Sequence, residues 1–159
     1  MTAGEVAAAT DATRAGTTRA LRDIERELGV LLHRVRRRTA ENAQAVDPGL
    51  QPAAYPVLLY VVEHEGVRAA AIVDHFGIDK GAVSRHVGHL EALGLVTRSC
   101  DPDDRRAQVL VATATGQERV RSLQAERRRV FADRLSDWSE EELADLAGRL
   151  ARYNAALGG

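Results

Sequence analysis

Two apolar stripes, one towards each end of the chain, constrain the fold more than any other feature of this sequence. In both stripes apolar side chains recur at alternating three- and four-residue steps, the spacing of one face of an amphipathic helix. The first comprises Leu21, Ile24, Leu28, Leu31, Leu32 and Val35, and the second Leu143, Leu146, Leu150, Tyr153 and Leu157. Neither stripe has an apolar partner nearby in the sequence. They must pack on each other or on a second copy, and we favour a symmetric dimer because it buries more apolar surface.

Helix-capping and helix-stopping residues divide the rest of the chain into short elements. Pro48 and Gly49 end the first helix, and Asp79 can cap a helix that follows a turn at Gly77. Ser or Thr followed by Glu three residues later, as at Thr115 and Ser139, is the capping-box pattern of a helix start. The predicted elements are helices over 19–46, 54–65, 67–76 and 79–93, strands over 95–100 and 108–113, and two C-terminal helices beginning near Thr115 and Ser139, the first of which buries Val120, Leu123, Phe131 and Leu135.

These elements predict a mainly α protein with a small β-ribbon, an α+β fold in one domain. At 159 residues the chain has the length of a single domain, and residues 1–17, rich in small and polar side chains, are predicted to be a disordered tail. The start of the chain lacks the pattern of a signal peptide, and no apolar run approaches the roughly 18 residues of a membrane helix. With a lone Cys100, we expect a cytoplasmic protein without membrane contact or internal disulfide.

The helix predicted over 79–93, in the stretch DKGAVSRHVGHLEALGLV, has one apolar and one low, polar face. Val83, Val87 and Leu90 share the apolar face. Two glycines, Gly81 and Gly88, lie on the other, although each costs roughly 0.5–1 kcal/mol relative to alanine within a helix. A polar face with short side chains suits a helix that packs closely against a large partner. The polar side chains there could equally form an ordinary solvated surface.

Helix, glycine-containing turn, helix and basic-tipped ribbon is the order of a winged helix-turn-helix, and the sequence resembles the MarR (multiple antibiotic resistance regulator) family. The resemblance lies in VRAAAIVDHFGIDKGAVSRHVGHLEALGLV, in Arg98, in the wing DPDDRRAQVLV, and in Thr113 with Gly116. It implies a single domain over 18–159, with a winged helix-turn-helix lobe at about 53–113 between dimerisation helices at about 18–46 and 115–157. Ala112 departs from the family, which usually has leucine there.

The resemblance implies a sequence-specific regulator of transcription that binds double-stranded DNA, a ligand-responsive repressor acting as a homodimer on a pseudo-palindromic operator. On the second helix of the motif, short side chains and donors suit base edges and phosphates in the major groove. In the wing, Asp104 can orient Arg106, which by resemblance enters the minor groove, or the wing is only a solvated loop of mixed charge. The candidate DNA contacts are Lys80, Gly81, Ser84, Arg85, His89, Arg98, Asp104, Arg105 and Arg106.

Small ligands of the family, often phenolic or other aromatic anions, bind between the dimerisation helices and the winged lobe. The candidates for such a cleft here are His33, Arg37, Tyr55 and Tyr60. The histidines are scattered over different helices, and Cys100 lies far from the first helix, where peroxide-sensing members carry their cysteine. We therefore expect no metal, no cofactor and a structural thiol. The sequence has no Gly-x-Ser-x-Gly motif and no Gly-rich phosphate loop, so we expect no enzyme. A net charge of −1 leaves a second possibility open, a winged-helix protein-interaction module without DNA binding.

Overall fold

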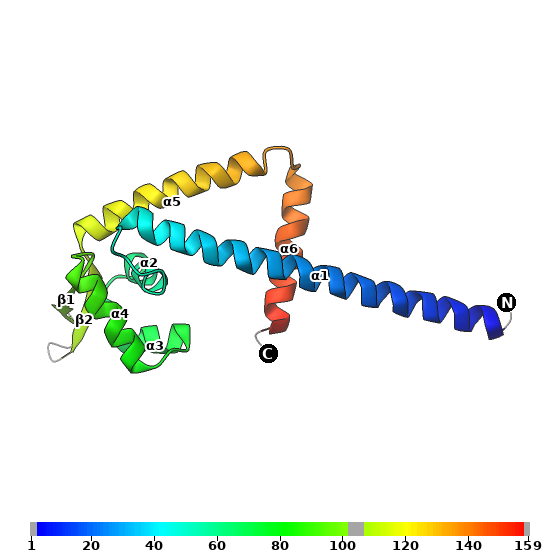
Figure 1. Ribbon diagram of the computed structural model, residues 1–159, viewed down its shortest axis with the longest axis horizontal. Helices are drawn as coiled ribbons and strands as arrows, with labels where there is room; N and C mark the ends of the chain where they lie inside the picture. Colours follow the sequence, from blue (N-terminus) through cyan, green and yellow to red (C-terminus); the bar gives the residue numbers. More distant parts are fainter. Residues whose placement is uncertain (1–2, 102–106, 158–159) are drawn as a thin grey trace.

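The computed structural model describes residues 3–101 and 107–157, with side chains from residue 16 onwards. It confirms a mainly helical chain with one two-stranded antiparallel ribbon. In Figure 1, α2, α3, α4 and the ribbon gather in one lobe, from which α1 and α5 extend. The elements are α1 (Ala3–Val46), α2 (Tyr55–Glu63), α3 (Ala69–Phe76), α4 (Lys80–Ala92), β1 (Val96–Cys100), β2 (Gln108–Ala112), α5 (Ala114–Arg134) and α6 (Glu140–Leu157).

The first helix is longer than predicted. It ends at Val46, as the sequence indicated, but it begins at Ala3, so the prediction of a disordered tail is wrong for residues 3–17. Alanine is the strongest helix former and is frequent in this segment, and no proline interrupts it, so the backbone continues the helix towards the N-terminus. Within the described residues, no helix is long and apolar enough to cross a membrane.

Side-chain caps define two of the helix starts as predicted. Asp79 Oδ1 accepts a hydrogen bond of 2.9 Å from the Ala82 amide at the start of α4. At the start of α6 the capping box is complete, because the Ser139 amide donates to Glu142 (2.8 Å) and the Glu142 amide donates to Ser139 Oγ (3.2 Å). Gly77, with φ of +62°, closes α3 in the left-handed conformation that favours glycine.

The start of α5 differs from the prediction. The cap is Thr113, whose Oγ1 accepts from the Gly116 amide at 3.0 Å, and the predicted capping residue Thr115 lies inside the helix. Thr113 Oγ1 also donates to the Gly94 carbonyl at 2.7 Å, which ties the helix start to the residues before β1. A Cβ at Gly116 would collide with the Leu95 carbonyl oxygen. This close approach of two backbones therefore fixes where α5 begins.

The apolar core lies in the lobe. Leu58, Ile72, Leu90 and Leu95 are fully buried, and they come from α2, α3, α4 and the approach to β1. The ribbon pairs in register from Val96 with Ala112 to Cys100 with Gln108. Val67 forms an isolated antiparallel bridge to the ribbon, since it exchanges two backbone hydrogen bonds with Leu110 of β2, at 3.0 and 2.8 Å. The ribbon is thereby attached to the helices of the lobe.

Beyond the lobe, the helices bury little of their apolar surface in a single chain. Val120 of α5 is buried and Leu123 is half-buried, but Phe131 is 67% exposed, so the prediction that α5 buries it is wrong for one chain alone. The reason is that α5 extends away from the lobe (Figure 1), and Leu123 is the last of its side chains that packs against the core. None of the residues of α6, all of them in the described part of the chain, is buried.

Candidate nucleic-acid interface

Helix α4 presents its two predicted faces to opposite environments. Val83, Val87 and Leu90 are buried in the core, and the face that carries Ser84 and Arg85 is exposed. Lys80 and Gly81, in the first turn, are exposed as well. Four of the predicted DNA-contacting residues therefore occupy one accessible side of a helix that the core holds in place from behind.

The two glycines of α4 have different local causes. A Cβ at Gly81 would lie 2.9 Å from Asp79 Oδ1, the carboxylate oxygen that caps the helix, so the cap alone favours glycine there. At Gly88 a Cβ would meet no described atom within 4 Å outside its own stretch of helix. Packing within the chain thus gives no reason for Gly88. The low surface at this position is consistent with close approach of a partner to the exposed face.

Arg98 connects the ribbon to α4. Its Nε and Nη2 donate to the two carboxylate oxygens of Glu91, at 3.0 and 3.3 Å. A bidentate pair of this kind fixes the plane of the guanidinium as well as its position. Arg98 is nevertheless 44% exposed, so its outer edge stays accessible. The interaction holds the base of the wing at a set position relative to the exposed face of α4.

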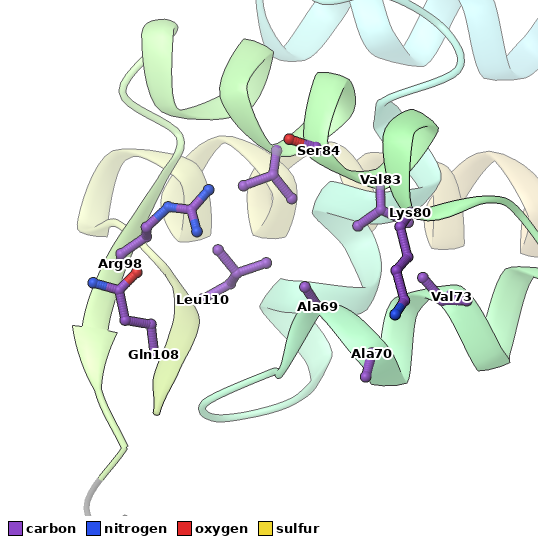
Figure 2. Close-up of a pocket in the computed structure, with 10 residues that line it drawn as sticks. Ala69, Ala70, Val73, Lys80, Val83, Ser84, Arg98, Gln108 and Leu110 are labelled. Atoms are coloured by element: carbon purple, nitrogen blue, oxygen red, sulfur yellow. The ribbon is translucent and has the colours of Figure 1, made fainter. Parts of the chain in front are cut away.

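A cavity of about 240 Å³ separates α3 and α4 from the ribbon. Figure 2 shows Lys80 and Ser84 on the α4 side and Arg98 with Gln108 on the strand side, with apolar side chains that include Leu110 between them. Three of the predicted residues, Lys80, Ser84 and Arg98, are therefore gathered around one recess. The cationic side chains of Lys80 and Arg98 both line this recess.

His89 points elsewhere. It is half-buried, and its Nε2 accepts a hydrogen bond of 3.2 Å from the Gln51 amide in the loop between α1 and α2. A backbone amide can only donate, so His89 Nε2 is the acceptor of this bond. His89 is thus directed at the neighbouring loop, and its predicted contact with DNA stays a prediction.

The wing residues Asp104, Arg105 and Arg106 lie outside the described residues. At the base of the wing, Asp101 is 7% exposed, and its Oδ2 accepts from Arg68 Nε and Nη2 at 2.9 and 2.6 Å. Sequence reasoning missed this pair, because its members are 33 residues apart and no motif links them. It attaches the wing to the residue before α3.

The residues predicted for a ligand cleft do not surround one cavity. His33 and Arg37 are exposed on α1, where Arg37 pairs with Glu41 at 3.2 Å. Tyr55 is 2% exposed in the core, and the ring of Tyr60 stacks on His75 with 4.4 Å between centroids. The reason is the position of each residue around its helix. The Tyr55 side chain lies in the core of the lobe, whereas His33 and Arg37 lie on an exposed side of α1.

A different set of residues lines a cavity of about 680 Å³ between α1, α2 and the outer half of α5. It contains Arg38, Asn42, Glu63, Leu123, Gln124, Glu126, Arg127, Arg128, Val130, Phe131 and Arg134. Next to it, burial raises the pKa of the Tyr55 hydroxyl, and the nearby Arg127 guanidinium partly opposes that shift. This hydroxyl has no hydrogen bond of standard geometry to any described residue. Arg38, one position after the predicted Arg37, lines the cavity together with Asn42, which is also on α1.

No three histidine, cysteine, aspartate or glutamate side chains come close enough to hold a metal ion in the described part of the chain. His64 and His75 are both close to Tyr60, with ring centroids at 4.2 and 4.4 Å, and form an aromatic cluster with Phe76. Cys100 is a free, exposed thiol at the end of β1.

Comparison with known proteins finds relatives of this chain in sequence and a similar fold among solved structures. Residues 49–107 match the model of the MarR family. The chain is 30% identical over 104 residues to YdgJ, an uncharacterized HTH-type transcriptional regulator of Bacillus subtilis, an alignment covering 65% of this chain and 63% of that protein. The chain thus spans just under two thirds of the length of that relative. The HTH-type transcriptional repressor MdtR of Bacillus subtilis is 26% identical, with 84% of this chain and 85% of that protein aligned.

Among solved structures, the fold is similar to a MarR family regulator from Listeria monocytogenes, determined in complex with a 26mer DNA. The TM-score is 0.66 at 21% identity, and the match covers 83% of this chain and 87% of that one. At this identity the similarity shows the fold, which includes the helices on both sides of the winged lobe.

Proposed function

We propose that this chain, whose residues 49–107 match the model of the MarR family, is a sequence-specific regulator of transcription that binds double-stranded DNA in the cytoplasm. The observation that carries the proposal is the exposed face of α4, with Ser84 and Arg85 outward and Gly88 free of packing, beside a ribbon held by Arg98. A helix of this kind fits the major groove, where short side chains and arginine contact base edges. The DNA complex of the Listeria monocytogenes regulator supports this use of the fold.

We propose further that the protein acts as a homodimer. Large apolar side chains stay exposed along α1 and α6, among them Ile24 at 50% and Leu150 at 44%. A two-fold dimer that buries these helices would present two equivalent α4 helices to one side. The operator is then an imperfect palindrome with half-sites about one helical turn, roughly 10 bp, apart. Repression, as in the related MdtR, is the mode of action that we favour.

The cavity between α1, α2 and α5 supports release by a small aromatic or phenolic anion. Four arginines line it against two glutamates, and Phe131 with Leu123 supplies an apolar surface. The buried Tyr55 hydroxyl nearby has a hydrogen bond to offer. A ligand that fits only one arrangement of α5 relative to the lobe would shift the dimer away from the DNA-binding arrangement. In this proposal Arg38 and Arg127 replace the sequence-based candidates His33 and Arg37.

Selection of bound fragments from genomic DNA tests the proposal, since it reports both binding and target. Binding to the selected site should weaken as a power of salt concentration, because cationic side chains displace counterions from phosphates. Arg85→Ala should reduce retention, whereas Arg149→Ala, an exposed arginine of α6 paired with Asp145, serves as the matched control. A protein that retains no DNA even at low salt would instead favour the protein-interaction module.

A further inference from the structure

The loop between α1 and α2 contacts both the dimerisation helices and α4. Asp47 and Gly49 lie at its start and Gln51 in its middle, and the loop begins where α1 ends. Arg119 of α5 holds it from one side and His89 of α4 from the other. We call these five residues, Asp47, Gly49, Gln51, His89 and Arg119, the loop clasp.

On the α5 side, the clasp is an ion pair with an additional backbone contact. Arg119 Nη1 donates to Asp47 Oδ2 at 2.7 Å and to the Val46 carbonyl, the last residue of α1, at 3.1 Å. Asp47 Oδ1 accepts from the Gly49 amide at 2.8 Å, so both carboxylate oxygens are used. The Asp47 side chain is only 20% exposed. These bonds fix the end of α1 to α5 and shape the first turn of the loop.

On the α4 side, the loop touches the last turn of the helix. The Gln51 amide donates to His89 Nε2 at 3.2 Å, and a Cβ at Gly49 would lie 3.3 Å from Leu93 Cδ2. Leu93 is the C-terminal cap residue of α4. Gln51 of the loop thus contacts His89, and Gly49 lies beside the Leu93 side chain. Both residues are at the C-terminal end of α4, whereas Lys80 is at its start.

We propose that the loop clasp sets the position of α4 relative to the dimerisation helices, and that His89 is a positioning residue for DNA binding. This inference rests on the proposed function as a dimeric DNA-binding protein. In a dimer, the separation of the two α4 helices must match the spacing of two half-sites. A contact that links the end of α1 and the side of α5 to the end of α4 controls that separation directly. His89 contributes by accepting a hydrogen bond from the loop.

The test compares affinity for the selected operator with affinity for operators whose half-site spacing is changed by one base pair. The wild-type protein should bind the altered operators much more weakly. His89→Leu removes the acceptor at similar volume, and we expect a loss of roughly fivefold on the natural spacing. The loss on altered spacings should be smaller, so that discrimination between spacings narrows while base preference stays unchanged. His89→Gln should restore the wild-type profile, because its amide oxygen can accept from the Gln51 amide.

Arg119→Met opens the clasp from the other side and should narrow the spacing discrimination in the same way. Its matched control is Arg121→Met, two residues along α5, where the arginine contacts only Gln117 among the bonds described. If His89→Leu does not fold, the spacing discrimination of Arg119→Met still tests the proposal. Altered base preference in either His89 variant would instead make His89 a base-contacting residue and overturn the proposal. Unchanged affinity and spacing preference in both His89→Leu and Arg119→Met would overturn it too, whereas failure of the wild-type protein to bind any DNA would overturn the proposed function itself.

Discussion

The winged lobe and the helices outside it use the same kind of apolar periodicity with opposite results. In the lobe, α2, α3 and α4 place their apolar faces in a common core, where Leu58, Ile72 and Leu90 are fully buried. Along α1 and α6 the stripes are equally regular, yet Leu32 is 56% and Leu157 66% exposed. The lobe is therefore complete within one chain, and the outer helices are not.

This difference shows what periodicity can and cannot predict. A 3.6-residue repeat tells which face of a helix will be apolar, but not whether the partner of that face belongs to the same chain. Exposed apolar side chains on this scale indicate an interface, since contiguous apolar patches on monomers are small. We therefore expect the outer helices to depend on a second copy for their stability, and the predictions below test that dependence first.

Deleting residues 139–159 should have the largest effect. The deletion removes α6, whose exposed apolar side chains, such as Leu150, are proposed to be buried in the dimer together with those of α1. We expect unfolded or aggregated protein, because an obligate dimer has no stable folded monomer. Size-exclusion chromatography with light scattering and circular dichroism measures the outcome. A soluble, folded, monomeric truncation would show that the lobe and α1 need no partner.

Substitution of a buried and an exposed leucine sharpens the comparison. Leu90→Ala, in the core of the lobe, should lower the free energy of unfolding by about 2–5 kcal/mol, because it leaves a cavity. Leu146→Ala, at a position 38% exposed in the single chain, should chiefly weaken the dimer. The melting temperature of that variant should fall most at low protein concentration. Calorimetry over a hundredfold range of concentration tests both. Equal losses at every concentration would argue against a dimer interface on α6.

Arg106→Ala tests the wing separately from α4. The residue lies outside the described part of the chain, and its proposed contact is with the minor groove. We expect a loss of roughly 1–3 kcal/mol per half-site, falling mainly on preference at the outer flanks of the operator. Asp104→Ala should give a smaller loss in the same direction, because it frees the guanidinium without removing it. Binding titrations on operators with altered flanks measure the effect, and unchanged melting temperature is the control. Unaltered affinity and flank preference would remove the wing from the mechanism.

The sequence predicted the lobe better than the contacts that orient its parts. Caps at Asp79 and Ser139 were predictable, because a cap depends on residues three positions apart. For α5 the capping-box pattern indicated Thr115, but the cap is Thr113, which the family resemblance placed at the opening of this helix; the approach of Gly116 to Leu95 across the fold decides between them. The tail was misjudged because composition suggests disorder and helix propensity equally well in an alanine-rich segment.

In the candidate site, too, the features that depend on local sequence were predicted, and those that depend on contacts across the fold were not. The exposed face of α4 follows from the helical period, since Arg85 lies opposite the buried Val83 and Val87 and Ser84 lies on the flank. His89 shares the edge of that face, and only its bond to Gln51, 38 residues away, shows that it turns towards the loop. The pair Arg68 with Asp101 and the arginine-lined cavity likewise depend on segments that the fold brings together. The apolar pattern along one helix determines which of its side chains are exposed. The tertiary contacts determine towards which neighbour an exposed side chain is directed.

The smallest expected effect concerns Asp47, where the two regions meet. The Gly49 amide and then Arg119 hold the pKa of this carboxyl below its ordinary value of 3.8. A carboxyl whose pKa is lowered by folding stabilises the folded state at pH values above its unfolded pKa, and the contribution disappears as the pH falls through the folded pKa. Asp47→Asn should therefore lower the melting temperature slightly at pH 7, and the difference from wild type should shrink below about pH 4. Asp145→Asn, in an exposed pair on α6, is the matched control and should change little at either pH, because exposed ion pairs contribute little. A difference for Asp47→Asn that is equal at pH 7 and pH 3 would mean that its charge does not hold the end of α1 against α5, and the junction between lobe and outer helices would then depend on packing alone.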